Sequence, residues 1–173
     1  MVMENFVFAL AALLISVIAL GLAAWQIHVA RGANHLPVVL DAFKTSNYPE
    51  WFEAQEYILN RLSREHAAGC AWRDLPQQAR DQVNTIGLFY DDLGKLIAHQ
   101  VIGEDLVIGS YGDSIVHLWD ALAPYVYAER AHMPDFWVYF EDLAVRTANT
   151  STRAVYAKLR LRKRPPRRQP DAA

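Results

Sequence analysis

One pair of residues has the spacing of a metal-binding motif, because Glu129 and His132 form a Glu-x-x-His sequence. Carboxylate-bridged di-iron proteins use two such pairs on different helices, together with further carboxylates that project inward. Further carboxylates could come from Asp91, Asp92, Glu141 and Asp142, but no second Glu-x-x-His sequence occurs in the chain. His132 also falls near an expected helix end, where the helix dipole alone stabilises an imidazolium. We therefore predict no metal site and no cofactor.

The sequence contains none of the common catalytic motifs. There is no glycine-rich phosphate loop, no Gly-x-Ser-x-Gly elbow, and no His-Glu-x-x-His or Cys-x-x-Cys motif. Cys70 is the only cysteine, which excludes an internal disulfide and fits a reducing compartment. It would act as a nucleophile only if a histidine approached it in the fold. We predict no catalytic residue. An enzyme remains an alternative, because the members of a Ser-His-Asp set need not be close in sequence.

Arg130 and Glu141 are charged residues set among large apolar ones, on two expected helices joined by a short turn. We interpret them as an ion pair that holds these helices together. Such a pair adds little net stability, but removing one partner of a buried pair costs roughly 3–5 kcal/mol. The alternative is an enzyme or small-ligand sensor, with a polar pocket between helices around these two residues and Asp91 or Asp92.

The charge of the chain is split between an acidic body and a basic tail. Residues 31–157 carry ten basic and 17 acidic side chains, whereas residues 158–173 carry seven and one. Clusters of roughly four to eight Lys and Arg bind anionic lipid surfaces, and we rank a merely solubilising tail second. Nucleic acid is ranked third, because basic side chains neutralise phosphates but no aromatic residue follows Tyr156 to stack on bases. The residues assigned to lipid or nucleic-acid contact are Lys158, Arg160, Arg162, Lys163, Arg164, Arg167 and Arg168.

Apolar residues at spacings of three and four predict that helices position these groups. One helix is expected over residues 49–66, where Trp51, Ala54, Ile58 and Leu62 form an apolar stripe. The longest amphipathic helix is expected over residues 76–100. Asp74 and Gln77 resemble a capping box at its start.

Two glycines, Gly87 and Gly94, lie seven residues apart on one side of the long helix. Each weakens a helix by up to about 1 kcal/mol relative to Ala, so we expect a neighbouring helix to approach closely there. Further along, we expect a glycine break before helical spacing resumes at Asp113, and another helix from Asp135. No segment alternates with the period of a strand, and the predicted fold class is therefore all-α.

The N-terminal segment Phe6–Ile27 is apolar, and no Asp, Glu, Lys or Arg occurs between Asn5 and Ala30. As a helix, 22 residues extend about 33 Å, which matches the thickness of a bilayer core. A cleaved signal peptide is less consistent with the acidic start MVMEN and the length of the run. Arg31 after the span favours a cytoplasmic domain and an N-terminus outside. The sequence therefore predicts a single-pass membrane protein.

Several segments together resemble a known family. They are GLFYDDLGKLIAHQVI, WDALAP and FWVYFEDLA, with Arg130 between the last two. They are similar to a family of small bacterial proteins anchored by one membrane span and catalogued only as a domain of unknown function. The resemblance extends over about residues 1–145. It implies one anchor and a helical domain, and it implies no activity. The positions that carry it are Phe89, Tyr90, Gly94, Leu96, Ile97, Trp119, Arg130, Phe140, Glu141, Leu143 and Ala144.

These observations predict three regions: a transmembrane anchor at residues 1–31, a cytoplasmic helical domain at residues 32–152, and a basic tail at residues 153–173. Within this tail, we expect a last helix over residues 153–164 and disorder over residues 165–173. The function that we expect is a membrane-tethered adaptor or scaffold that binds an unidentified protein, with its basic tail on anionic lipid. The alternatives are the enzyme or ligand sensor and a membrane-tethered nucleic-acid binder.

Overall fold

The structure, a computed structural model, describes residues 12–23, 25–26, 40–41, 44 and 46–162. Every regular element among these residues is a helix, and none of them is a strand. The chain divides into two compact units, Met1–Phe43 and Lys44–Ala173. The all-α prediction is confirmed for the part of the chain that the structure describes.

The first unit contains the predicted membrane span. Residues 12–23 and 25–26 are helical, whereas residues 6–11, 24 and 27 of the predicted span lie outside the described residues. Among the residues that are described, no helix is both long and apolar enough to cross a membrane. The span therefore stays a prediction.

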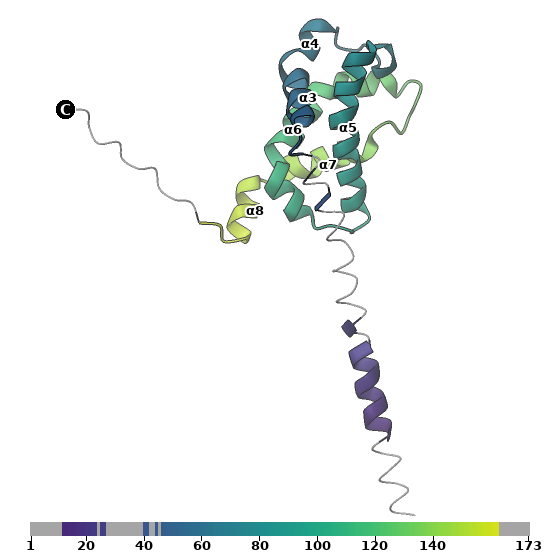
Figure 1. Cartoon of the computed structure of the whole chain (residues 1–173), viewed down its shortest axis with the longest axis vertical. Coiled ribbons are helices and arrows are strands. Elements are labelled where there is room, and N and C mark those ends of the chain that lie inside the picture. The colour runs from purple at the N-terminus through teal and green to yellow at the C-terminus, as the bar shows by residue number, and fades with distance from the viewer. Residues whose placement is uncertain (1–11, 24, 27–39, 42–43, 45, 163–173) are drawn as a thin grey trace, which may run out of the picture. The chain divides into compact units, whose positions relative to one another are not determined.

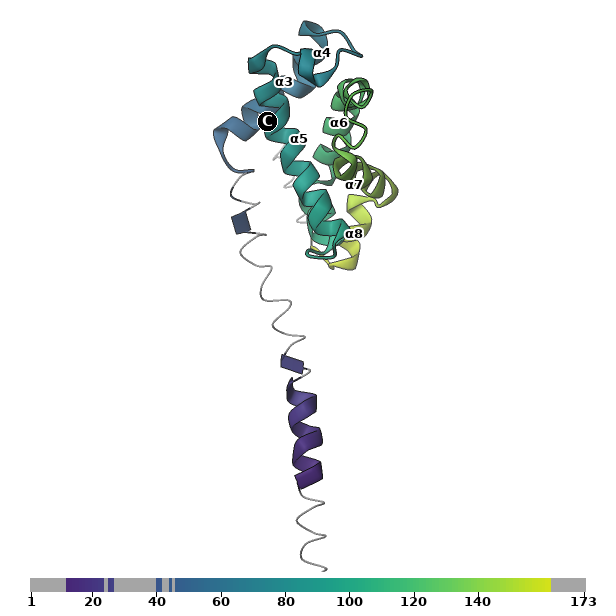
Figure 2. The same cartoon turned by 90° about the vertical axis from the view of Figure 1, so that its right-hand side faces the viewer.

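The second unit is a helical bundle. α5 makes its most extensive contact with α7, α3 packs against α5 and α6, and α8 contacts α6. Both views place α8 near the end of the bundle that lies away from α4 (Figures 1 and 2). The elements are α3 (Pro49–Asn60), α4 (Leu62–Glu65), the 3-10 helix η1 (Trp72–Asp74), α5 (Gln77–Ala98), α6 (Glu104–Glu129), α7 (Val138–Asn149) and α8 (Thr152–Lys158).

The core of the bundle is formed by the apolar stripes that the sequence predicts. Aromatic rings join the helices: Tyr90 of α5 stacks on Phe140 of α7, with 5.1 Å between ring centres. Trp119 of α6 meets the same Phe140 ring edge-on at 5.1 Å. The predicted stripe of α3 and α4 is also buried, and it comprises Trp51, Ala54, Ile58 and Leu62. Burial of these side chains is what stabilises short helices that would be marginal alone.

Both glycines of α5 lie where neighbouring residues come closest. The indole of Trp137 occupies the space that a Cβ at Gly87 would need. The backbone of Tyr139, in the first turn of α7, occupies the equivalent space at Gly94. The predicted close approach of a neighbouring helix is therefore confirmed, and that helix is α7.

The predicted capping box at the start of α5 is wrong. The helix begins at Gln77, with Pro76 before it and no side-chain cap. Leu75 and Pro76 are both extended, with ψ angles of 146° and 151°, and they separate Asp74 from the first turn. A residue that precedes proline is disfavoured from the helical region, which explains the extended backbone of Leu75. Asp74 instead ends η1.

The predicted glycine break before Asp113 is also wrong. α6 runs without interruption from Glu104 through Gly109 and Gly112. α8 covers both glycines, since a Cβ at Gly109 would lie 3.4 Å from Val155 and one at Gly112 would meet Thr152. Packing of α8 against the small residues offsets their cost to the helix.

Candidate functional site

Arg130 and Glu141, which the sequence singled out, contact each other across the turn between α6 and α7. Nη1 of Arg130 lies 2.5 Å from Oε2 of Glu141. Nε of Arg130 donates to the carbonyl of Phe136 at 2.9 Å, and the Tyr127 hydroxyl donates to Oε1 of Glu141 at 2.7 Å. The guanidinium also lies 5.4 Å from the centre of the Tyr127 ring and 6.0 Å from that of Trp119. Both charges thus have partners in α6, in α7 or in the turn that connects these helices.

The electrostatics of this pair favour the ionised carboxylate. Burial alone would raise the pKa of Glu141, but hydrogen bonds from Tyr127 and Arg130 and the positive charge of Arg130 lower it below its usual value. Nη2 of Arg130 is buried and has no hydrogen-bond partner among the described residues. The other two nitrogens of this guanidinium, Nε and Nη1, bind the carbonyl of Phe136 and the carboxylate of Glu141. These contacts are expected for a group that orders the turn between two helices.

We expect Arg130→Ala to lower the free energy of unfolding by about 2–3 kcal/mol, because Glu141 would remain partly buried without its cation. Thermal unfolding of the full chain, followed by tryptophan fluorescence, measures this loss. Arg61→Ala is the matched control, because its ion pair with Glu65 is exposed and exposed pairs contribute little to stability. Equal melting temperatures for the two variants would contradict a structural role of Arg130.

Asp91, the other carboxylate proposed for a polar pocket, caps α7 from the neighbouring helix. Its Oδ1 accepts hydrogen bonds from the backbone N–H groups of Tyr139 and Phe140, both at 3.1 Å. Its Oδ2 pairs with Lys95 at 2.9 Å. The first N–H groups of a helix have no partner within the helix, and a carboxylate there is also favoured by the dipole. Asp92 is exposed and pairs with the same lysine.

α7, the helix that Asp91 caps, starts later in the chain than the sequence predicts. The helix begins at Val138 rather than at Asp135, because Trp137 has a left-handed backbone with a φ of 51°. The left-handed region is unusual for a residue with a large side chain. Its buried indole covers Gly87, so packing supports the conformation.

The most buried carboxylate belongs to Glu129, which sequence reasoning had considered only as part of a Glu-x-x-His motif. Its side chain is 1% exposed and pairs with Nη2 of Arg73 at 2.5 Å. Nε and the backbone N–H of Arg73 also donate to it, at 2.7 and 3.0 Å. Burial would raise the pKa of Glu129, but these bonds and the arginine charge lower it. This contact between Arg73 and Glu129, which we call the clamp, fixes η1 to the end of α6. The two residues are 56 positions apart, so no local sequence pattern could reveal their contact.

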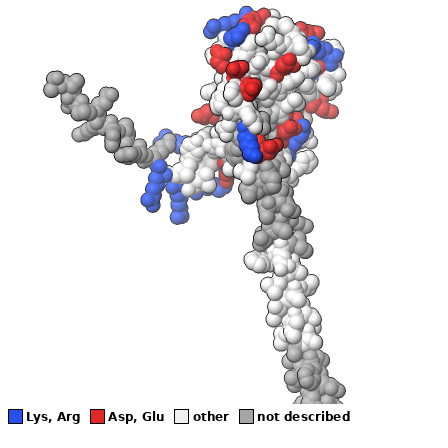
Figure 3. Space-filling model, viewed as in Figure 1, with Lys and Arg blue, Asp and Glu red and all other residues white. Residues whose placement is uncertain are grey.

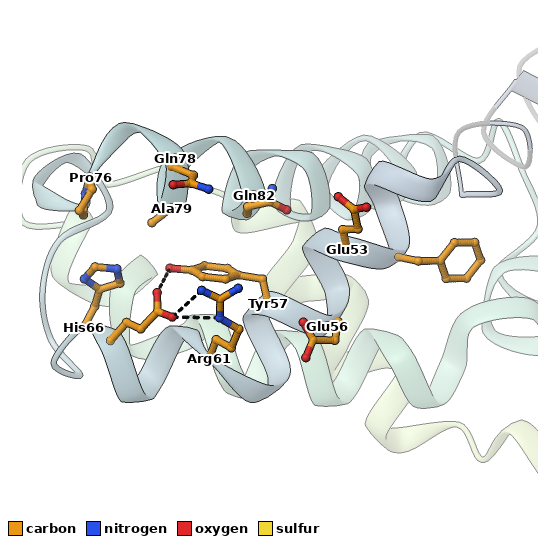
Figure 4. A pocket seen from close by; sticks show the side chains of 11 residues that line it. Glu53, Glu56, Tyr57, Arg61, His66, Pro76, Gln78, Ala79 and Gln82 are labelled. Atoms are coloured by element: carbon orange, nitrogen blue, oxygen red, sulfur yellow. Dashed lines mark hydrogen bonds and ion pairs between the residues drawn. The ribbon is translucent and has the colours of Figure 1, made fainter.

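A groove that the sequence did not reveal lies between α3–α4 and the start of α5 (Figure 4). Its volume is about 640 Å³. Figure 4 shows Gln78 and Gln82 on one wall, facing Tyr57 and Arg61 on the other. The residues that line it are Phe52, Glu53, Glu56, Tyr57, Arg61, Glu65, His66, Pro76, Gln78, Ala79 and Gln82.

The groove presents hydrogen-bond acceptors and a negative charge. Glu65 accepts from Nε of Arg61 at 2.9 Å and from the Tyr57 hydroxyl at 3.2 Å, so the charge of Arg61 is compensated within the groove. Glu53 and Glu56 are exposed, and neither makes a hydrogen bond or ion pair among the described residues. Oε1 of Gln82 is buried and has no hydrogen-bond partner in the part of the chain that the structure describes. These groups suit a cationic occupant better than an anionic one.

The basic residues assigned to lipid or nucleic-acid contact begin at the end of α8, where Lys and Arg side chains gather in the view of Figure 3. Lys158 pairs with Asp105 of α6. Arg160 and Arg162 are exposed. Four of the assigned residues lie outside the described residues, namely Lys163, Arg164, Arg167 and Arg168.

Comparison with protein families identifies the family of this chain. The model of a family described as a domain of unknown function, DUF4760, matches residues 13–147. The chain belongs to this family. The predicted resemblance to a family catalogued only as a domain of unknown function is thereby confirmed, and the matched DUF4760 region contains α3 to α6 and most of α7 and ends before α8. No curated protein and no solved structure matches the chain.

Proposed function

We propose that this DUF4760 protein is a membrane-tethered adaptor, whose helical domain binds a cationic segment of another protein in the groove between α3–α4 and α5. The apolar segment at residues 6–27 is the tether. It places the protein in the bacterial inner membrane, with the N-terminus outside and the helical domain in the cytoplasm. The basic residues from Lys158 onward contact anionic lipid.

The observation that carries this proposal is the contrast between two groups of carboxylates. Asp91, Glu129 and Glu141, the buried or half-buried ones, are each bound by donors of this chain that join one element to another. Glu53 and Glu56 line an open groove and have no ion pair among the described residues. The carboxylates that join elements of the fold are thus distinct from the carboxylates of Glu53 and Glu56, which are left open to a partner in the groove.

The chemistry of the groove indicates what kind of partner it fits. A lysine or arginine side chain would meet the carboxylates of Glu53 and Glu56. Two aromatic side chains, Phe52 and Tyr57, line the same groove, and aromatic faces also attract cations. Complementary charge would give the complex its specificity and its association rate more than its affinity.

The test is cross-linked co-purification of the full chain from bacterial membranes in mild detergent, with nuclease treatment. We expect one protein to be recovered by the wild-type chain and lost with Glu53→Gln combined with Glu56→Gln. Asp120→Asn with Asp135→Asn is the matched control, because both carboxylates are exposed outside the groove.

Two results would contradict the proposal. One is recovery of the partner by the groove variant at the level of the control. The other is recovery that disappears with nuclease and with deletion of residues 158–173, which would support binding of nucleic acid instead. Fractionation of the chain with membranes tests the tether separately.

A further inference from the structure

α8 ends in a defined hydrogen-bonded turn. The backbone N–H of Arg160 donates to the carbonyl of Ala157 at 3.0 Å, and that of Leu161 donates to the carbonyl of Tyr156 at 3.0 Å. This pair of bonds is the Schellman motif that terminates many helices. It fixes the directions of Leu159, Arg160 and Leu161 relative to the helix.

Arg160 occupies the position of this motif that glycine usually takes. Its φ of 54° lies in the left-handed region, which is less favourable for a residue with a side chain than for glycine. Glycine would form the same turn at lower cost but would supply no charge. Arg160 therefore places a cation at a position where the backbone conformation disfavours a side chain.

Apolar and basic side chains alternate along this turn, and both kinds are exposed. Leu159 is 53% and Leu161 57% exposed. Arg160 and Arg162 are also exposed and make no ion pair among the described residues. Exposed leucines flanked by unpaired cations suit an anionic membrane surface, where apolar groups enter the acyl boundary and arginines meet phosphate groups.

The segment is also firmly joined to the bundle. Val155 is 2% exposed and packs over Gly109, and the Tyr156 hydroxyl donates to the carbonyl of Gly109 at 3.0 Å. Lys158 pairs with Asp105 near the start of α6. A membrane contact at the end of α8 would therefore orient the whole bundle.

We propose that Leu159–Arg162 is an interfacial lipid-binding segment, in which Leu159 and Leu161 insert into an anionic bilayer and Arg160 and Arg162 bind its phosphate groups. The inference rests on the membrane tether of the proposed function. It extends that function because it adds two leucines to a lipid contact that otherwise consists of basic residues alone. It also makes the docked α8 the element that sets the orientation of the groove.

The experiment uses the full chain in vesicles and a polarity-sensitive probe. Leu159→Cys in a Cys70→Ser background is labelled with nitrobenzoxadiazole, and the protein is reconstituted into vesicles of phosphatidylcholine alone or with phosphatidylglycerol. Ser63→Cys on exposed α4 is the matched control position. We expect a blue-shifted emission that nitroxide lipids quench at position 159, only with phosphatidylglycerol, and a water-like emission at position 63.

Second variants separate the two contributions. Leu161→Asn should lower the ratio of inserted to water-exposed probe about tenfold, because burial of a leucine side chain favours the apolar phase by at least that factor. Arg160→Gln with Arg162→Gln should weaken the dependence on phosphatidylglycerol, and about 0.5 M salt should remove it.

Vesicle flotation of the same samples reports on the tether independently. Protein that floats while the probe at position 159 stays water-like overturns the interfacial segment and leaves the tether intact. Protein that neither floats nor shifts its emission overturns both. A shift that RNA produces in phosphatidylcholine vesicles overturns the lipid assignment in favour of nucleic acid.

Discussion

Replacing Gly94 by alanine is expected to lower the free energy of unfolding by about 2 kcal/mol. The added Cβ would overlap the backbone carbonyl of Tyr139, and a backbone atom in the first turn of α7 cannot rotate away as a side chain can. α5 and α7 would have to separate, which would also strain the bonds from Asp91 to that turn. Overpacking of this kind typically costs about 1–3 kcal/mol. The cost must exceed the gain of up to about 1 kcal/mol that alanine brings to a helix interior.

Urea unfolding followed by tryptophan fluorescence measures this effect, and Gly109→Ala provides the control. Gly109 also lies inside a helix, but a Cβ there would make ordinary contact with Val155 at 3.4 Å. Alanine at position 109 should therefore leave stability unchanged or raise it by up to about 1 kcal/mol. If Gly94→Ala were as stable as Gly109→Ala, the close packing of α5 on α7 would be wrong.

The glycines of α5 show what the sequence could predict. An amphipathic helix tolerates two glycines on one side only if something compensates for them, so a close neighbour could be inferred before its identity was known. The apolar stripes were predictable for the same reason, because the spacing of Trp51, Ala54 and Ile58 reflects one helical face. These features depend on local periodicity, which a single sequence contains.

Features that depend on contacts between distant segments could not be predicted. Gly109 and Gly112 looked like a break because α8, which covers them, was not known to pack there. Asp91 looked like a candidate site residue because the backbone groups that it binds belong to α7, 48 residues away. The groove likewise requires α3–α4 and α5 to lie side by side. Only the Arg130–Glu141 contact, which spans one turn, was close enough in sequence to be proposed.

The largest effect of a single charge is expected at the clamp between Arg73 and Glu129. Arg73→Ala should destabilise the fold at pH 7 at least as much as Arg130→Ala, because it removes the cation from a carboxylate that is 1% exposed in the wild-type chain. Glu129→Gln is the informative partner variant, since its amide keeps an acceptor for the backbone N–H of Arg73 without burying a charge. Its cost should therefore be smaller, because Arg73 is partly exposed and can return to water.

The pH dependence of these variants identifies the buried charge as the cause. In the wild-type chain Arg73 holds the pKa of Glu129 below its usual value, so the clamp stabilises the fold above about pH 4.3, the usual pKa of a glutamate, and is lost as pH falls through the lowered folded value. Without Arg73, burial dominates and raises the folded pKa. The destabilisation of Arg73→Ala is then largest at pH 7 and shrinks as acid protonates Glu129. Unfolding free energies measured from pH 7 to pH 4 should therefore converge for Arg73→Ala and the wild type. A constant difference across that range would mean that Arg73 acts through packing rather than through charge.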